Sequence, residues 1–217
     1  MCSSLPDNAY KYPIEKMLTL NTMDERMKET LDAWLKYGTV FLIYRLCTYY
    51  FFDRENENAE LFDKESLRLV FFILLGFTIY YLLVKPYIPI HLQHPIINNI
   101  ANDSLMFGTV LVSSHIMETF MNNGEYFNTQ WLKSAGLILL SFAAYRVFIN
   151  PFIPLKNMKL NNASLVSDWA QFGTFLIVLR LLENKTIFDK KWALSILFVL
   201  LGFTGYHLIT KKIIIVD

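Results

Sequence analysis

Apolar residues are grouped into six long runs, and polar residues are concentrated between them. Runs of 16 to 20 mostly apolar residues predict helices, and the two runs at 67–84 and 192–210 are almost free of charge. The other four predicted helices cover 33–52, 104–121, 131–149 and 166–182. A hydrocarbon core about 30 Å thick is spanned by about 20 apolar residues in a helix. The pattern therefore predicts an all-α integral membrane protein with six transmembrane helices.

The six runs form three pairs that share their motifs. The first run of each pair begins with an aromatic-Gly-Thr triplet and has a basic residue seven positions after the glycine. The second run contains a small residue, a phenylalanine and, three positions further on, a tyrosine. The glycine, basic and small positions are Gly38, Arg45 and Gly76, then Gly108, His115 and Ser141, then Gly173, Arg180 and Gly202. Fixed order at a nearly constant interval predicts one helical hairpin in three tandem copies.

This interpretation divides the chain into four parts. The hairpin units are expected at 33–98, 99–160 and 161–217, after a different N-terminal segment at 1–32. Charged and apolar residues mix at helical spacing in 14–32, which is typical of a surface helix on a membrane or partner. A solvated tail is the alternative for this segment. It contains no apolar stretch of the kind that a secretory signal requires.

Short polar residues and prolines predict where the second helix of each hairpin begins and ends. Asp63, Asn128 and Asp189 are expected to be N-caps, because their side chains can accept backbone N–H bonds. Pro86 and Pro151 are expected to end two of these helices and to begin extended connectors. All four tryptophans lie near predicted helix ends, as aromatic residues at a membrane interface do.

Composition and charge exclude several classes of function. The formal net charge is +1, so no basic surface marks a nucleic-acid partner. Cys2 and Cys47 have no metal-binding spacing, and phosphate-binding loops and catalytic motifs are absent from the sequence. We therefore expect no enzymatic activity, no cofactor and no metal. Ten basic residues on the terminal side of the six helices against seven on the other favour cytoplasmic termini.

Ionisable residues inside the apolar runs are the candidate functional residues. A stripe of basic and acidic side chains on the first helix of each hairpin predicts a polar cluster in the membrane. Its members are Arg45, His115, Arg180, Glu118 and Glu183. The alternative is that these residues anchor helix ends at the interface. The same interpretation applies to Arg146, His207 and the motif tyrosines Tyr80, Tyr145 and Tyr206.

Small residues in the motifs have a simpler expected role. Helices in lipid associate by close packing, for which small side chains are favoured. We expect this role for six residues, namely Gly38, Gly108, Gly173, Gly76, Ser141 and Gly202.

Two resemblances bear on function. Three tandem two-helix units resemble the architecture of mitochondrial carriers, but the carrier motif with proline at the ends of the first helices is missing, since the chain has Phe51-Phe52-Asp53 there. In composition, the chain resembles small polytopic membrane proteins of large DNA viruses, which are rich in Asn, Ile, Phe and Tyr. That resemblance implies an internal virion membrane as location, and other membrane or capsid proteins as partners besides the lipid bilayer.

Two functional hypotheses follow. The first is a structural, anchoring membrane protein, for which the charged residues hold the hairpins together. The second is a small channel or transporter for protons or an anion, whose cavity is lined by the polar cluster around a pseudo-threefold axis. A lipid-modifying enzyme is a distant third, because no nucleophile and base occur together.

Overall fold

The computed structural model describes residues 24–54, 60–122, 124, 126, 128–154, 158–183, 185, 186 and 189–213. Within these ranges all regular structure is helical, in six long helices, so the all-α prediction is confirmed. The helices are α1 (Glu25–Thr48), α2 (Lys64–Ile79), α4 (Pro95–Asn122), α5 (Thr129–Ala144), α6 (Leu160–Leu182) and α7 (Lys190–Gly205). Short helical segments extend four of these helices. Tyr49–Asp53 follows α1, and Tyr80–Val84 and α3 (Lys85–Tyr87) follow α2. Tyr145–Ile149 and Asn150–Phe152 follow α5, and Tyr206–Thr210 and α8 (Lys211–Ile213) follow α7.

The predicted N-caps are confirmed at the start of α2, α5 and α7. The Asp63 carboxylate accepts a hydrogen bond from the Ser66 backbone N–H at 2.7 Å, and Asn128 accepts one from the Trp131 N–H at 2.8 Å. Asp189 caps α7 through the N–H of Lys191 at 3.1 Å. Each cap satisfies a backbone donor that the first helical turn leaves without an intrahelical partner.

Helix bounds differ from the prediction at both ends of the hairpins. Helix α1 begins at Glu25, capped by Asp24, so residues 25–32 belong to the first long helix. Residues 1–23 of the predicted N-terminal segment 1–32 lie outside the described residues. Pro86 and Pro151 do not stop their helices, which continue to Tyr87 and Phe152. Proline is tolerated there because each one lies in the first turn of a new short helical segment, where its missing N–H needs no partner.

A wider, π-helical turn interrupts the second helix of each hairpin at the same motif position. The turns are Tyr80–Val84, Tyr145–Ile149 and Tyr206–Thr210, and each begins at the motif tyrosine. Proline alone does not explain them, because Lys211 and Lys212 follow the third turn where the others have proline. Such insertions often occur at functional positions in helices.

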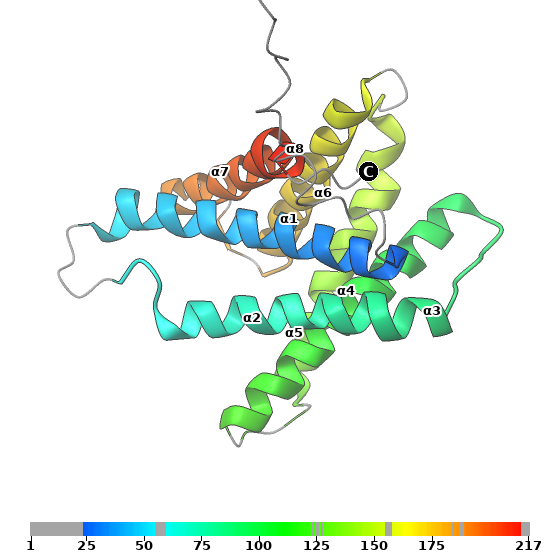
Figure 1. Ribbon diagram of the computed structural model, residues 1–217, viewed down its shortest axis with the longest axis horizontal. Coiled ribbons are helices and arrows are strands. Elements are labelled where there is room, and N and C mark those ends of the chain that lie inside the picture. The colour runs from blue at the N-terminus through cyan, green and yellow to red at the C-terminus, as the bar shows by residue number, and fades with distance from the viewer. Residues whose placement is uncertain are drawn as a thin grey trace, which may run out of the picture.

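The six long helices pack as a closed ring. Consecutive helices are in contact, and α7 returns to α1, which lies antiparallel to α2 (Figure 1). The most extensive contacts join α1 with α7, α2 with α4, and α5 with α6. The second helix of one hairpin thus packs most closely against the first helix of another.

Small residues permit this packing, but only in the second helices. A Cβ added at Gly202 would lie 2.7 Å from the Cα of Val40, and one at Gly76 would lie 2.9 Å from the Cα of Val110. Ser141, the third residue of this set, is fully buried in α5. Added Cβ atoms would meet nothing within 4 Å at the other three predicted packing positions, Gly38, Gly108 and Gly173.

Aromatic rings from all six long helices meet in the centre of the ring of helices. They belong to the two shared motifs and pair within each hairpin, with centroid distances of 4.3 Å for Tyr37–Phe77, 3.9 Å for Phe107–Phe142 and 4.6 Å for Phe172–Phe203. Edge contacts link the pairs, including Tyr37–Phe172 at 6.0 Å and Phe107–Phe172 at 6.2 Å. We call these six residues the aromatic core.

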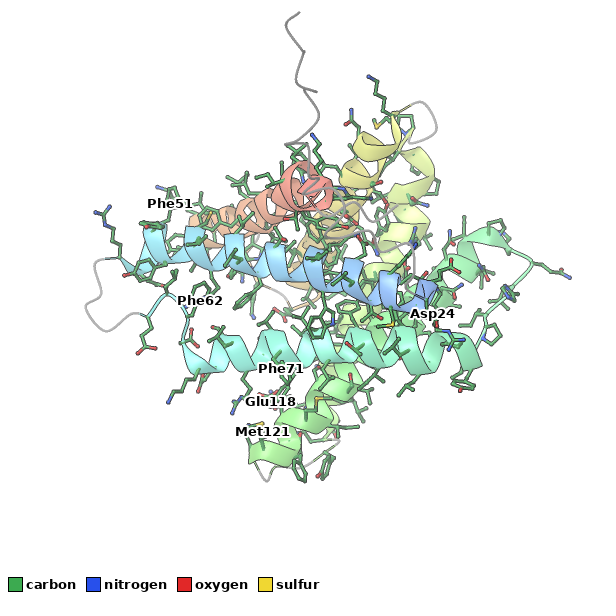
Figure 2. The ribbon with its side chains drawn as sticks, in the orientation of Figure 1. Asp24, Phe51, Phe62, Phe71, Glu118 and Met121 are labelled. Carbon is green, nitrogen blue, oxygen red and sulfur yellow. The ribbon has the colours of Figure 1, made fainter. Side chains whose placement is uncertain are left out.

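Four helical stretches are long and apolar enough to cross a membrane. They cover Lys64–Tyr87, Thr129–Phe152, Asn162–Leu182 and Lys190–Thr210. Large apolar side chains also point outward, as Figure 2 shows for Phe51, Phe71 and Met121, which are more than half exposed. Helices α1 and α4 carry more polar residues, so length and composition single out four of the six predicted spans.

Candidate functional site

Arg45 reaches the loop that closes the first hairpin. Its Nη2 lies 2.9 Å from the carboxylate of Asp63, the N-cap of α2. It also donates hydrogen bonds to the backbone carbonyls of Leu61 and Glu60, at 3.2 and 3.1 Å. Arg45 therefore ties the end of the first helix to the start of the second.

The equivalent residues of the other hairpins make related contacts. Arg180 lies 3.5 Å from Asp189, the N-cap of α7, and its guanidinium is stacked 5.3 Å from the ring centroid of Trp192. His115 stacks on Trp131 in α5, with centroids 4.4 Å apart. All three basic residues thus contact the N-cap or the first turn of the helix that follows in their own hairpin.

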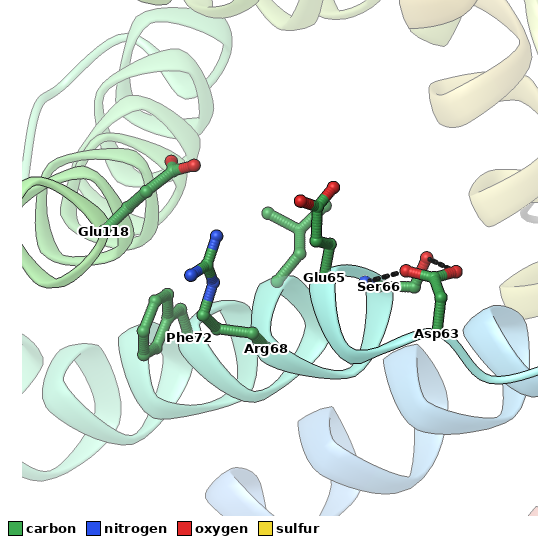
Figure 3. A pocket seen from close by; sticks show the side chains of 7 residues that line it. Asp63, Glu65, Ser66, Arg68, Phe72 and Glu118 are labelled. Carbon is green, nitrogen blue, oxygen red and sulfur yellow. Dashed lines mark hydrogen bonds between the residues drawn. The ribbon is translucent and has the colours of Figure 1, made fainter. Parts of the chain in front are cut away.

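The two acidic members of the predicted cluster lie elsewhere. Glu183 pairs with Lys185 at 2.8 Å in the loop after α6. Glu118 faces a surface pocket of about 290 Å³ between α2 and α4, opposite Arg68, and Asp63 lies at the other end of the residues that line it (Figure 3). Arg45, Arg180 and Glu183 therefore pair with three different groups, each in or beside the loop nearest to it.

The Asp63 cap predicts a pH dependence. Hydrogen bonds from the backbone N–H and hydroxyl of Ser66, with a smaller contribution from Arg45, lower the pKa of Asp63 from its ordinary value of 3.8. A lowered pKa stabilises the folded protein above that value, and the contribution is lost as the pH falls through the lowered pKa. We expect Asp63→Asn to reduce the melting temperature slightly at neutral pH and to converge with the parent in acid, as measured by thermal unfolding in detergent.

Glu65→Gln is the matched control for this experiment, because Glu65 is exposed in the same helical turn. At neutral pH the melting temperature of Glu65→Gln should lie closer to that of the parent than the melting temperature of Asp63→Asn does. An Asp63→Asn difference that does not shrink in acid would contradict the assignment.

A different set of charged residues does come together, around a cavity beside the aromatic core. Arg146, in the π-helical turn after α5, binds Asp103 of α4 with two hydrogen bonds, from Nε at 2.6 Å and from Nη2 at 3.0 Å. Both side chains are largely buried. Two parallel bonds from a guanidinium to a carboxylate make this the best-defined ion pair of the described residues.

Asp168 of α6 is the centre of a second group. It accepts a hydrogen bond from His207 Nε2 at 2.7 Å and pairs with Lys36 Nζ at 3.1 Å. His207 is only 4% exposed. The hydroxyl of Tyr206, next to it, donates to Asp32 of α1. These contacts join α1, α6 and the turn after α7.

The two groups border one cavity of about 140 Å³, which we call the polar chamber. Six charged or polar residues line it, namely Asp32, Lys36, Asp103, Arg146, Asp168 and Gln171. Tyr37 and Phe107 of the aromatic core line it as well. A larger outer pocket of about 370 Å³ shares Asp32 and Tyr81 with the chamber and also includes Glu25 and Lys211. The chamber therefore adjoins a charged surface pocket on one side and the aromatic core on another.

The sequence contained a signal for this chamber. Asp103 and Asp168 each lie five residues before a motif glycine, and Arg146 and His207 each follow a motif tyrosine. The interpretation of Arg146, His207 and the tyrosines as interfacial anchors is wrong. Tyr80, Tyr145 and Tyr206 are at most 5% exposed, and the basic residues pair with buried carboxylates. Hydropathy patterns cannot show this, because the partners are distant in sequence.

Comparison with known proteins identifies no relative: no protein-family model, curated protein or solved structure matches the chain. Within the described residues, no group of three or more His, Cys, Asp or Glu side chains is arranged to hold a metal ion.

Proposed function

We propose that this chain is a membrane-spanning scaffold whose six long helices cross the bilayer as three repeated hairpins. Four stretches are long and apolar enough for this role. In α1 and α4, the polar residues that lower the hydropathy include Lys36 and Asp103, which face the polar chamber rather than lipid. Polar side chains on the inside of a bundle are compatible with a transmembrane helix.

Recurrent geometry supports the repeat. The N-cap, the π-helical turn and the paired aromatic rings occur at matching motif positions in all three hairpins. In two of them a tryptophan four residues before the motif glycine also donates its indole N–H to a carbonyl of the second helix: Trp34 to Leu74 and Trp169 to Leu200, both at 3.0 Å. A single ancestral hairpin accounts for this agreement more simply than independent origins.

The aromatic core is the observation that carries the structural role. A pore along the axis would have to pass between six rings that stacking and edge contacts link into one network. The basic residues expected to line such a pore close the hairpins instead. A helical bundle held together by these contacts is suited to anchoring other proteins at a membrane. The more specific proposal, that the protein is an anchor beneath a viral capsid, is supported by the compositional resemblance alone.

Flux through proteoliposomes tests this proposal. We expect purified protein, reconstituted in folded form, to conduct protons and chloride no faster than protein-free liposomes. The variants His115→Gln and Arg45→Gln should lower thermal stability and leave flux at background. Flux clearly above background that disappears in His115→Gln would overturn the scaffold. Stoichiometric purification with a larger assembly would support it.

The polar chamber favours a second candidate, a small transporter. Buried ion pairs beside a closed core are the arrangement expected of an occluded binding site that opens by rearrangement of the core. In that case Phe107→Ala should raise flux of a small solute several-fold, and Asp103→Asn combined with Arg146→Gln should abolish it. Flux at background in all of these folded variants would exclude the transporter.

A further inference from the structure

Open hydrogen-bond acceptors and open donors are both present in the polar chamber. A carboxylate has about four acceptor positions. Arg146 fills two of them at Asp103, and His207 and Lys36 fill others at Asp168. A guanidinium carries five N–H donors and an ammonium three, so Arg146 and Lys36 keep donors beyond these bonds. Since neither kind predominates, a matching occupant has to donate as well as accept hydrogen bonds.

The amide of Gln171 leads to the same requirement. Its side chain borders the chamber, the residue is only 8% exposed, and Nε2 is buried without a hydrogen-bond partner among the described residues. Exchanging the two amide atoms turns this open donor into an open acceptor. Buried polar groups are normally satisfied, because a buried group without a partner is unfavourable. An occupant that both donates and accepts satisfies the amide in either orientation.

The charges inside the chamber are already balanced. Asp103 is paired with Arg146, and Asp168 with Lys36. The remaining carboxylate, Asp32, lies where the chamber meets the outer pocket, whose lining also includes two lysines. An added cation would compete with the bases of the two ion pairs, and an added anion would compete with their carboxylates. A neutral occupant leaves both ion pairs intact.

Size and access agree with water as this neutral occupant. A volume of about 140 Å³ holds about four water molecules. A buried water needs two to four polar partners, which the charged and polar lining of the chamber supplies. The outer pocket, which shares Asp32 and Tyr81 with the chamber, provides the entrance. Tyr37 and Phe107 of the aromatic core border the chamber as well, so a path for water would end at the core.

We propose that the polar chamber is a water-filled vestibule, in which ordered water molecules bind Gln171 and join the Asp103–Arg146 pair to the Asp168–Lys36 pair. The vestibule opens to the outer pocket, and the aromatic core closes it. A few ordered waters satisfy the open donors and acceptors without the screening that bulk water provides, so both ion pairs remain largely buried. This hydration goes beyond the scaffold role, which requires no water inside the helical bundle.

Hydroxyl-radical footprinting by X-ray radiolysis tests the proposal, because radicals formed from a bound water oxidise the side chains next to it. Met106 is half-buried, borders the chamber and accepts a hydrogen bond from Tyr81 through its sulfur. Met117 is a half-buried methionine of the same helix that does not border the chamber, so it is the matched control. In the purified full chain, we expect oxidation of Met106 to be several times faster than that of Met117.

Two variants show whether the radicals come from water in the chamber. Asp103→Leu combined with Arg146→Met replaces the ion pair by apolar side chains and should slow the oxidation of Met106 to the rate of Met117. Gln171→Leu removes only the amide and should slow it part of the way. The rate at Met117 should stay unchanged in both variants. Equal oxidation of the two methionines in the folded parent overturns the proposal, and so does a rate at Met106 that every folded variant leaves unchanged.

The footprint and the flux measurement test separate properties of the protein. A chamber without water would leave the background flux expected of the scaffold untouched. Flux above background would overturn the scaffold and leave the hydration of the chamber to be decided by the oxidation of Met106.

Discussion

Replacement of Asp103 by leucine is expected to destabilise the protein by about 3 kcal/mol, because it leaves the Arg146 guanidinium largely buried without its carboxylate. The double variant Asp103→Leu with Arg146→Met should regain most of that loss, since two apolar side chains of similar volume carry no desolvation penalty. Denaturant unfolding of the parent, both single variants and the double variant in one detergent gives the coupling energy directly.

Glu183→Gln is the control for this cycle. Its partner Lys185 is more than half exposed, although the two charges are only 2.8 Å apart. An exposed pair contributes about 0–1 kcal/mol. If Asp103→Leu costs no more than Glu183→Gln, then Asp103 and Arg146 are solvated and do not form a largely buried ion pair.

Gly202→Ala is the second substitution with a large expected effect. A Cβ at this position would lie 2.7 Å from the Cα of Val40 and 3.0 Å from its carbonyl oxygen, so α7 and α1 must move apart. Backbone atoms cannot rotate away as a side chain can. We expect a loss of about 1–3 kcal/mol in the free energy of unfolding, measured by denaturant titration in detergent.

Gly38→Ala provides a closely matched control, because Gly38 lies in α1, the helix that faces Gly202, and an added Cβ there meets nothing within 4 Å. Alanine is a better helix former than glycine by up to about 1 kcal/mol. Gly38→Ala should therefore be neutral or stabilising. An equal loss in the free energy of unfolding of both variants would contradict the prediction that helix packing distinguishes Gly202 from Gly38.

Gly38 and Gly202 show which part of a motif glycine's role the sequence alone reveals. Both glycines recur in the three hairpins, and the same packing role was expected of both. Sequence spacing gives the face of a helix on which a glycine lies, but not the distance to the helix opposite. The second helices pack closely against the first helices of other hairpins, and this arrangement places Gly76 and Gly202, but not Gly38, at a close approach.

Arg45 and Arg146 illustrate the same limit for charge. Each is a basic residue in an apolar run, about equally conspicuous in the sequence. Arg45 reaches a loop 15 to 18 residues further along the chain, whereas Arg146 reaches Asp103 across 43 residues. Arguments from the depth of a residue in the membrane and from the reach of its side chain apply to contacts with the nearest loop, such as that of Arg45. They cannot identify a partner on another helix, so the sequence alone does not reveal the polar chamber.

The sequence by itself determined the all-helical class, the approximate positions of six long helices and the N-caps of α2, α5 and α7. These features depend on local hydrogen bonding and on hydropathy over about 20 residues, both of which a linear pattern records. Only the tertiary structure decided that α7 closes the ring on α1, that six aromatic rings fill the centre, and that Asp103, Arg146 and Asp168 border one chamber. Those features depend on which helices become neighbours, and that choice follows from the fit of side chains that are far apart in the sequence.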